Sequence, residues 1–239
     1  MGNTLYFKEF LEKHSPSTFA KYLDHTLLKP IASFKDLEKA IEDTKKYGFA
    51  CLVVPPSFLE QAREISGNTI RLATVIGFPL GSTLTKVKVE EARESVLLGA
   101  KEIDMVMNIN MFKSGRRDYV LNDMKSVVEV SKKNGAEVVK VIIETGLLSD
   151  EEKIEATRLV IESGADYVKT STGFISGGAT VHDVSLLYKA SAGRIKVKAS
   201  GGIRHAEDAI AMILAGASRI GTSTAPKIYE EYVKLYEKT

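Results

Sequence analysis

The sequence predicts an α/β chain that folds as a single (β/α)8 TIM barrel with an additional N-terminal helical segment. Eight short apolar runs recur roughly every 20–35 residues, the length of a strand plus a crossover helix. No Pro-, Gly- or Ser-rich linker interrupts the 239 residues, and this length is typical of one barrel. We therefore expect one domain over residues 1–239, of which about 1–21 form the N-terminal helical extension.

The expected elements begin with helical sequence over residues 3–20. The eight expected strands are 22–25, 50–54, 71–76, 102–107, 138–143, 167–170, 195–199 and 218–221. Between them, residues 34–45 carry apolar side chains at helical spacing, and Ser149 opens a helix with a capping-box pattern. A closing helix is expected over about 224–237. An open doubly wound sheet is the competing architecture, but no Gly-x-Gly-x-x-Gly follows the first strand.

The composition favours a cytoplasmic enzyme or binding protein. The formal net charge is +2 without a long basic run, which gives no electrostatic footprint for nucleic acid or an anionic membrane. No apolar run approaches the roughly 20 residues that span a bilayer, and the first residues lack a signal-peptide pattern. The single cysteine, Cys51, excludes an internal disulfide framework. Any anionic ligand must therefore be bound by a local site.

Four charged residues are expected to point into the barrel. Alternate side chains of a barrel strand face inward, so residue parity predicts orientation. By this rule four neighbouring strands can bring one carboxylate and three ammonium groups into one interior: Asp104, Lys140, Lys169 and Lys198. A mixed-sign cluster partly compensates the cost of burying its charges.

Such a cluster favours amine chemistry. Burial and a second ammonium group both lower the pKa of a lysine, so a neutral Lys169 could attack an aldehyde and form a Schiff base, with Lys198 as its cationic neighbour. Asp104 could then shuttle protons during carbinolamine formation and imine hydrolysis. For any one lysine alone, the simpler interpretation is an outward-facing or strand-end residue paired with a helix carboxylate. Lys140 has either an electrostatic role or a structural ion pair.

Two small-residue loops predict a phosphate site at the strand ends. The seventh strand runs into Gly201-Gly202, the eighth runs into Gly221-Thr222-Ser223, and each loop precedes a helix. Glycine lets the backbone approach a ligand, and helix N-termini suit an anion. Gly201-Gly202 taken alone is also compatible with an ordinary turn.

Three further observations concern possible ligands. Asp24 either lines the barrel mouth or makes a structural hydrogen bond. Cys51 lies either near the pocket or in the core as a small hydrophobic residue. His14, His182 and His205 show no ligand spacing with carboxylate or cysteine, so we expect no metal site.

Several motifs resemble the class I 2-deoxyribose-5-phosphate aldolases over nearly the whole chain. The matching stretches are 24–30, 77–81, 102–108, 140–146, 168–174, 197–204 and 221–223, and the most specific are Lys-Thr-Ser-Thr-Gly at 169–173 and Lys-Ala-Ser-Gly-Gly at 198–202. The resemblance implies that Lys169 is the Schiff-base lysine and that Asp104 and Lys198 are its proton-transfer partners. It also implies that Gly173, Gly201, Gly202, Gly221 and Ser223 surround the phosphate. Asp24, Cys51, Lys140 and Thr170 complete the expected substrate-binding set.

The implied reaction is reversible cleavage of 2-deoxy-D-ribose 5-phosphate to acetaldehyde and D-glyceraldehyde 3-phosphate, in deoxyribonucleotide catabolism. The protonated imine acts as electron sink, so the resemblance implies no metal and no organic cofactor. Some relatives carry a lysine where this chain has Phe174, so one phosphate contact would be absent. We expect a homodimer or homotetramer.

Two other classes of function remain open at this point. One is a different phosphosugar barrel, either another Schiff-base aldolase or a metal-free isomerase. The other is a non-catalytic barrel that binds sugar phosphates, for which two buried lysines would be unnecessary.

Overall fold

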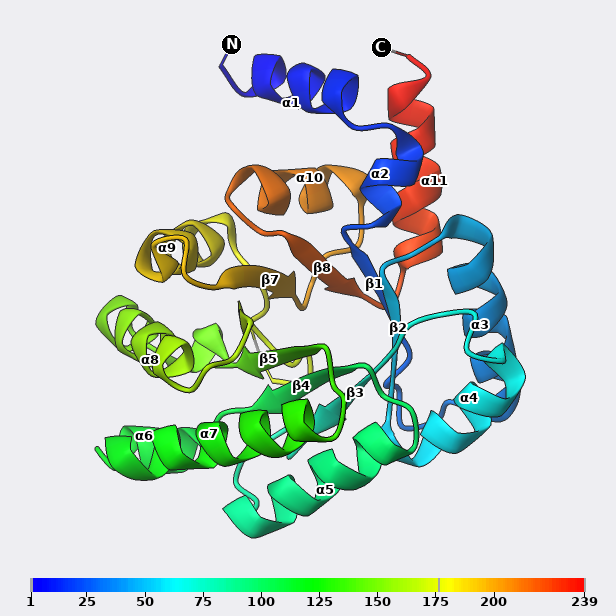
Figure 1. Cartoon of the computed structure of the whole chain (residues 1–239). Coiled ribbons are helices and arrows are strands. Elements are labelled where there is room, and N and C mark those ends of the chain that lie inside the picture. Colours follow the sequence, from blue (N-terminus) through cyan, green and yellow to red (C-terminus); the bar gives the residue numbers. More distant parts are fainter. Residues whose placement is uncertain (1, 176, 239) are drawn as a thin grey trace.

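The computed structural model describes residues 2–175 and 177–238, and its centre is a closed parallel barrel with strand order β1 to β8 (Figure 1). The strands are β1 (Leu23–Thr26), β2 (Cys51–Val54), β3 (Leu72–Ile76), β4 (Glu102–Val106), β5 (Val138–Ile142), β6 (Tyr167–Lys169), β7 (Lys196–Ser200) and β8 (Arg219–Thr222). The eight predicted strands are confirmed to within one residue at each end. Parallel pairing of β1 with β8 closes the sheet and confirms the barrel against the open alternative.

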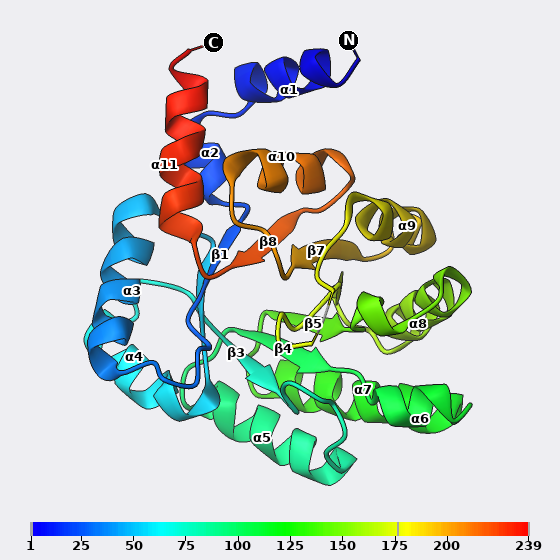
Figure 2. The ribbon, with the colours of Figure 1, turned by 180° about the vertical axis from the view of Figure 1, so that it is seen from behind.

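The helices surround the barrel as crossover connections (Figures 1 and 2). They are α3 (Phe34–Tyr47), α4 (Leu59–Ser66), α5 (Thr85–Leu97), α6 (Ile109–Lys113), α7 (Arg117–Lys133), α8 (Asp150–Glu162), α9 (Val181–Ser191), α10 (Ala206–Leu214) and α11 (Ala225–Tyr236), with 3-10 turns η1 (Pro56–Phe58) and η2 (Thr145–Leu147). The capping box predicted at Ser149 is present, because its hydroxyl accepts from the Glu152 amide while the Glu152 carboxylate accepts from the Ser149 amide. Among the described residues, no helix is long and apolar enough to cross a membrane.

The N-terminal extension is two helices, α1 (Gly2–Lys13) and α2 (Pro16–Ala20), whereas the sequence pattern predicts one helical stretch over residues 3–20. Ser15 is the N-cap of α2 and Pro16 its first residue, and this pair interrupts the helix. Phe19 of α2 stacks on Tyr232 of α11 with ring centroids 3.8 Å apart, and the Tyr232 hydroxyl donates to the His14 carbonyl at 2.6 Å. The first and last parts of the chain therefore pack side by side, as both views show.

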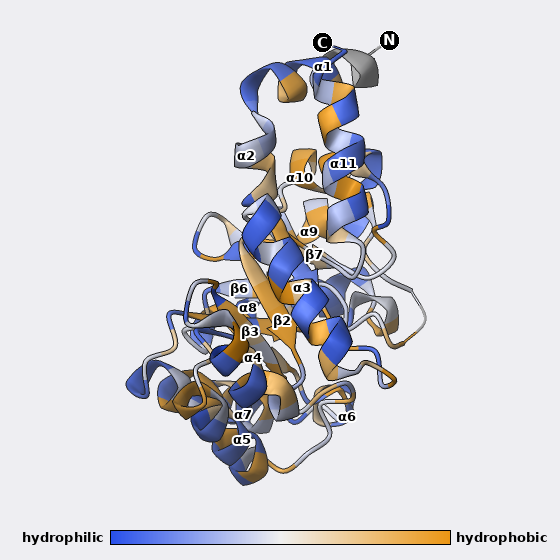
Figure 3. Cartoon of the chain, turned by 90° about the vertical axis from the view of Figure 1, so that its right-hand side faces the viewer, coloured by the Kyte–Doolittle hydropathy of each residue, from blue (hydrophilic) through white to orange (hydrophobic). Residues whose placement is uncertain are grey.

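The outer face of the barrel and its interior have different chemistry. Outward-facing strand residues such as Leu52, Val141 and Val168 pack under the helices in one large apolar core. Figure 3 shows the strongly hydrophobic β2 beneath the largely hydrophilic outer surface of α3. Inside, a small apolar cluster on β2 and β3 contains Cys51, Val53, Ala73 and Val75. The other strands contribute charged side chains, and these form the candidate site.

Candidate active site

Lys169 lies at the carboxyl end of β6, and its amine is buried against two other strands. Its Nζ donates to Asp104 Oδ2 of β4 at 2.8 Å, and the same oxygen accepts from Lys198 Nζ of β7 at 2.7 Å. The side chains of Asp104 and Lys198 are completely buried, and that of Lys169 is 5% exposed. Register pairing of Lys169 with Lys198 across β6 and β7 explains why parity correctly predicted their shared orientation.

The surroundings of Lys169, Lys198 and Asp104 shift the pKa of each group differently. Burial, helped by the charges of Lys198 and Lys140 and opposed by Asp104, lowers the pKa of Lys169 from 10.5 to about 8. Burial acts in the same direction on Lys198, but Asp104 and Asp24 together raise its pKa above the ordinary value. Burial would raise the pKa of Asp104, yet three lysines hold it well below its usual range. Near neutral pH, Lys169 is thus the amine that loses its proton first.

Lys140 lies deeper in the barrel than the cavity and makes two buried ion pairs. Its Nζ lies 2.9 Å from Asp104 Oδ1 and 2.5 Å from Glu102 Oε2. Both carboxylates raise the pKa of Lys140 against the effect of its burial. Of the two interpretations left open by the sequence, this placement supports the structural ion pair.

Glu102 and Arg219 were missed as members of this cluster by the sequence interpretation. The Arg219 Nη2 donates to Glu102 Oε2 at 2.9 Å across the barrel from β8 to β4. A parity signal existed for both, because Glu102 lies two residues before Asp104 and Arg219 two residues before Gly221.

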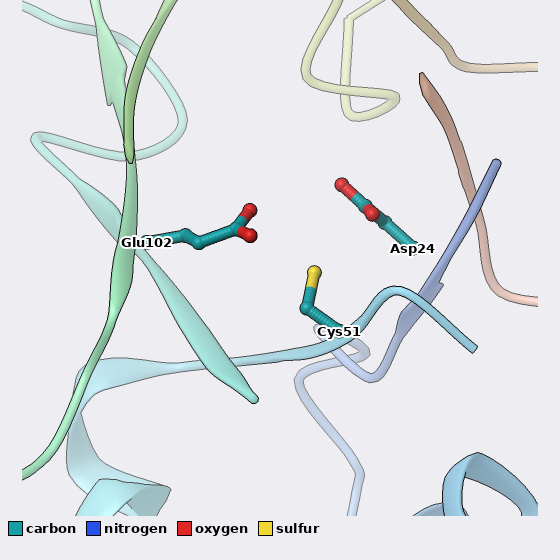
Figure 4. Close-up of side chains that lie close together, drawn as sticks. All are labelled: Asp24, Cys51 and Glu102. Carbon is teal, nitrogen blue, oxygen red and sulfur yellow. The ribbon is translucent and has the colours of Figure 1, made fainter. Parts of the chain in front are cut away.

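Asp24, Cys51 and Glu102 point toward one another in the barrel interior (Figure 4). This grouping resembles a metal-ligand set, but the guanidinium of Arg219 contacts all three residues. It lies 2.6 Å from Asp24 Oδ1, 2.9 Å from Glu102 Oε2 and 3.4 Å from Cys51 Sγ. Burial, together with the negative charges of Asp24 and Glu102, raises the pKa of the Cys51 thiol well above its usual value, so the thiol stays protonated. The cation at this position is therefore Arg219 itself.

A cavity of about 310 Å³ opens above Lys169 at the carboxyl ends of the strands. It is lined by Lys169, by Gly221 of β8 and by the loops after β1, β6, β7 and β8, including Lys29, Gly173, Gly201, Gly202, Arg204 and Ser223. Every glycine and serine of the predicted phosphate set thus borders one cavity. Gly221 is required here, because a Cβ would lie 3.1 Å from Lys198 Cε and 2.9 Å from Ser200 Cβ.

Four residues of the expected substrate-binding set do not line this cavity. Asp24, Cys51 and Lys140 contribute to the buried charges below it. Thr170 points out of the barrel, and its hydroxyl bonds the backbone carbonyl and amide of Ser200 at 3.0 Å each. The direct substrate contact expected of these four side chains stays a prediction, and the structure places them outside the lining of the cavity. Thr170 lies two residues after the outward-facing Val168, so strand parity predicts that its side chain also points outward.

Thr172 borders the cavity in place of Thr170, and Glu144 holds it there. Glu144 Oε2 accepts from the amide of Thr172 at 3.0 Å and from its hydroxyl at 2.6 Å. Glu144 is fully buried and has a left-handed backbone with φ 54°, an uncommon conformation for a residue with a side chain. The end of β5 thus fixes the loop that follows β6.

Phe174 lies at the cavity rim and is 47% exposed. Its ring meets the edge of Phe78 from the loop after β3, with centroids 5.0 Å apart. The loop after β6 therefore contributes an aromatic side chain next to Gly173 at the cavity rim. The cationic side chains that border it are Lys29, Lys169 and Arg204.

Residues 18–230 match the family model described as DeoC/LacD family aldolase. A curated deoxyribose-phosphate aldolase from Caldanaerobacter subterraneus subsp. tengcongensis is 52% identical over 224 residues, which cover 93% of this chain and 97% of the relative. One from Carboxydothermus hydrogenoformans is 50% identical and covers 92% and 97%, respectively.

Solved structures give the same result. The deoxyribose phosphate aldolase from Aeropyrum pernix, described as having a unique tetrameric structure, superposes with a TM-score of 0.88 at 35% identity, covering 96% of this chain and 97% of that one. An aldolase called QR15 superposes with a TM-score of 0.87 at 43% identity and covers 92% and 98%.

Proposed function

This chain belongs to the DeoC/LacD aldolase family, and we propose that it cleaves 2-deoxy-D-ribose 5-phosphate reversibly to acetaldehyde and D-glyceraldehyde 3-phosphate through a Schiff base on Lys169. The observation that carries the mechanism is a buried lysine of lowered pKa whose amine borders the substrate-sized cavity. An isomerase has no need for such an amine, and simple sugar-phosphate binding does not require its neutral form.

The lowered pKa makes the amine of Lys169 reactive near neutral pH. With a pKa of about 8, about one Lys169 in ten is neutral at pH 7, against roughly one in three thousand for a lysine of pKa 10.5. The neutral amine attacks the aldehyde carbon of the open-chain sugar, and loss of water gives the protonated imine. When the C2–C3 bond breaks, the imine accepts its electron pair and the C3 hydroxyl gives its proton to a base, for which the ionised Asp104 is in place. D-Glyceraldehyde 3-phosphate leaves and an enamine remains. Protonation of the enamine and hydrolysis of the resulting imine release acetaldehyde.

Asp104 and Lys198 have complementary roles in these proton transfers. Asp104 is ionised and 2.8 Å from Lys169 Nζ, so it accepts the proton that the attacking amine loses as the carbinolamine forms. Lys198 keeps its proton because Asp104 and Asp24 raise its pKa, and it can protonate the carbinolamine hydroxyl, which leaves as water. The pair therefore supplies a base and an acid at one position.

The phosphate is assigned to the opposite end of the cavity. Lys29 and Arg204 offer positive charge there, and the Gly201-Gly202 loop and the Ser223 loop precede α10 and α11. Phe174 occupies the position where some relatives have a lysine, so the charge at this site comes from other loops.

The proposal also covers the pathway, the cellular location and the oligomeric state of the protein. The reaction would serve deoxyribonucleotide catabolism, in the cytoplasm, in agreement with the single cysteine of the chain. A homodimer or homotetramer is proposed because the Aeropyrum pernix relative is described as tetrameric. Light scattering of the purified protein measures the assembly directly.

Trapping of the imine tests the mechanism. The protein is incubated with acetaldehyde, reduced with borohydride and mapped by mass spectrometry, and a single two-carbon adduct is expected on Lys169. Lys169→Met should lose both adduct and aldol cleavage, whereas Lys196→Gln, a change at an exposed lysine of the neighbouring strand, should keep both. An active enzyme without an adduct at Lys169 would refute the mechanism.

A further inference from the structure

Six buried side chains beneath Lys169 form a closed ring of alternating charge. Three are carboxylates and three are cations: Asp24, Glu102, Asp104, Lys140, Lys198 and Arg219. Arg219 is 13% exposed at its side chain, and the others are at most 1% exposed. The ring residues come from β1, β4, β5, β7 and β8, so the closed barrel is required to assemble them.

The contacts around the ring are short and continuous. In order, they are Asp104–Lys198 at 2.7 Å, Lys198–Asp24 at 2.6 Å, Asp24–Arg219 at 2.6 Å, Arg219–Glu102 at 2.9 Å, Glu102–Lys140 at 2.5 Å and Lys140–Asp104 at 2.9 Å. Each ionised member therefore has a neighbour of opposite charge on both sides. With three negative and three positive charges, the ring is neutral.

Lys169 contacts this ring through Asp104 and adds a seventh charge, a cation that no further carboxylate neutralises among the described residues. Among the described residues, Asp104 is the one carboxylate within ion-pair distance of its amine, and Asp104 already serves Lys140 and Lys198. A buried cation added to a neutral group of charges gains little attraction to offset its lost hydration. The directions of the pKa shifts agree, because the pKa values of Lys140, Lys198 and Arg219 are raised and that of Lys169 is lowered.

We propose that Arg219 and Glu102, at the amino-terminal end of the barrel, are positioning residues for the reaction, because they complete the neutral ring that leaves Lys169 as its one surplus cation. Neither residue borders the cavity. The influence of Arg219 on the amine passes through Asp24 and Lys198 to Asp104, and that of Glu102 passes through Lys140 to Asp104. The inference rests on the proposed Schiff-base function and adds to it two residues remote from the substrate.

Removal of a positive and of a negative ring member should shift the pH midpoint of imine formation in opposite directions. Arg219→Gln would leave the ring with a net negative charge, which stabilises the ammonium form of Lys169 and moves imine formation to higher pH. Glu102→Gln would leave a net positive charge and move it to lower pH. At an effective dielectric constant of about 20, a unit charge at the width of a barrel interior corresponds to roughly one pH unit. Damage to packing alone would not produce opposite shifts.

The experiment measures the rate of imine formation with acetaldehyde from pH 6 to pH 10, with samples quenched into borohydride at one fixed pH and the Lys169 adduct quantified by mass spectrometry. Arg219→Gln should raise the midpoint by about one unit, with a tenfold lower rate at pH 7, and Glu102→Gln should lower it. Arg219→Lys and the double variant Glu102→Gln/Arg219→Gln both keep the ring neutral and should restore the wild-type midpoint. Arg71→Gln is the matched control, since Arg71 is 39% exposed, is balanced by Glu137 at 2.5 Å and lies 3.7 Å from Glu102 outside the ring.

Midpoints that do not move, or that move in the same direction in both single variants, would overturn the proposal. If Arg219→Gln does not fold, Glu102→Gln decides the question, because its midpoint must fall below those of the wild type and of Arg71→Gln. A wild-type protein that forms no adduct at Lys169 would refute the proposed function instead. The two failures are thus distinguishable in one data set.

Discussion

At the residue scale, the chemistry of Lys169 depends on having fewer compensating contacts than its neighbours. Lys140 and Lys198 each contact two carboxylates, whereas Lys169 shares a single oxygen of Asp104 with Lys198. All three lysines are buried, so burial alone does not distinguish them. The number of anionic partners decides which lysine loses its proton.

Substitution of Lys198 tests the coupling at this scale. Lys198→Leu removes a cation 2.7 Å from the oxygen that Lys169 uses, so the pKa of Lys169 should rise from about 8 and the midpoint of imine formation should move upward. Loss of the proton donor should also lower kcat by roughly 10²- to 10⁴-fold. Lys198→Arg keeps the charge and should retain the midpoint. A Lys198→Leu profile that overlays the wild type would contradict the coupling.

At the scale of elements, the loop after β6 is held by the end of β5. Glu144 accepts two hydrogen bonds from Thr172, and Thr172 and Gly173 border the cavity. Because the anchor is fully buried, its loss leaves the amide and hydroxyl of Thr172 without their acceptor.

We therefore expect Glu144→Ala to loosen the loop and raise KM for the phosphorylated sugar about tenfold or more, with a smaller effect on the pH midpoint of imine formation. Glu144→Gln, whose amide oxygen can replace Oε2 as acceptor, should stay within a few-fold of the wild type. Steady-state kinetics on 2-deoxy-D-ribose 5-phosphate measure both. An unchanged KM in Glu144→Ala would show that Thr172 needs no anchor.

Strand parity explains how much of the site the sequence predicts. A period of two residues placed Asp104, Lys169 and Lys198 inside the barrel, and the structure confirms this orientation. The Arg219–Glu102 pair joins β8 to β4, which are not neighbours in the sheet, so its formation depends on the barrel diameter and on side-chain reach. Strand parity predicts neither the barrel diameter nor the reach of a side chain. The break between α1 and α2, by contrast, was readable from Ser15-Pro16.

At the scale of the whole molecule, the surplus charge of Lys169 should reduce stability. Lys169→Met leaves the neutral ring intact and removes a buried cation, so we expect the free energy of unfolding at pH 7 to increase on the order of 1–3 kcal/mol while activity is lost. Thermal and urea unfolding measure the difference. Lys140→Met, which removes a member of the ring, should destabilise the protein.

The pH dependence of this gain follows from the direction of the shift. The folded pKa of Lys169 is about 8 and the unfolded value 10.5, so the folded state loses its proton first as the pH rises. The unfolded state then holds more protons between pH 8 and 10.5, and the stability contribution of Lys169 improves with pH in this window. The advantage of Lys169→Met should be largest below pH 8 and disappear above 10.5. An advantage that is constant with pH would contradict the account.

The most direct measurement is the pH dependence of imine formation by the wild-type protein, read as the borohydride-trapped acetaldehyde adduct on Lys169. The account predicts one adduct at this residue and a rate that rises with pH to a midpoint of about 8. A midpoint near 10.5, or an adduct on another lysine, would contradict it.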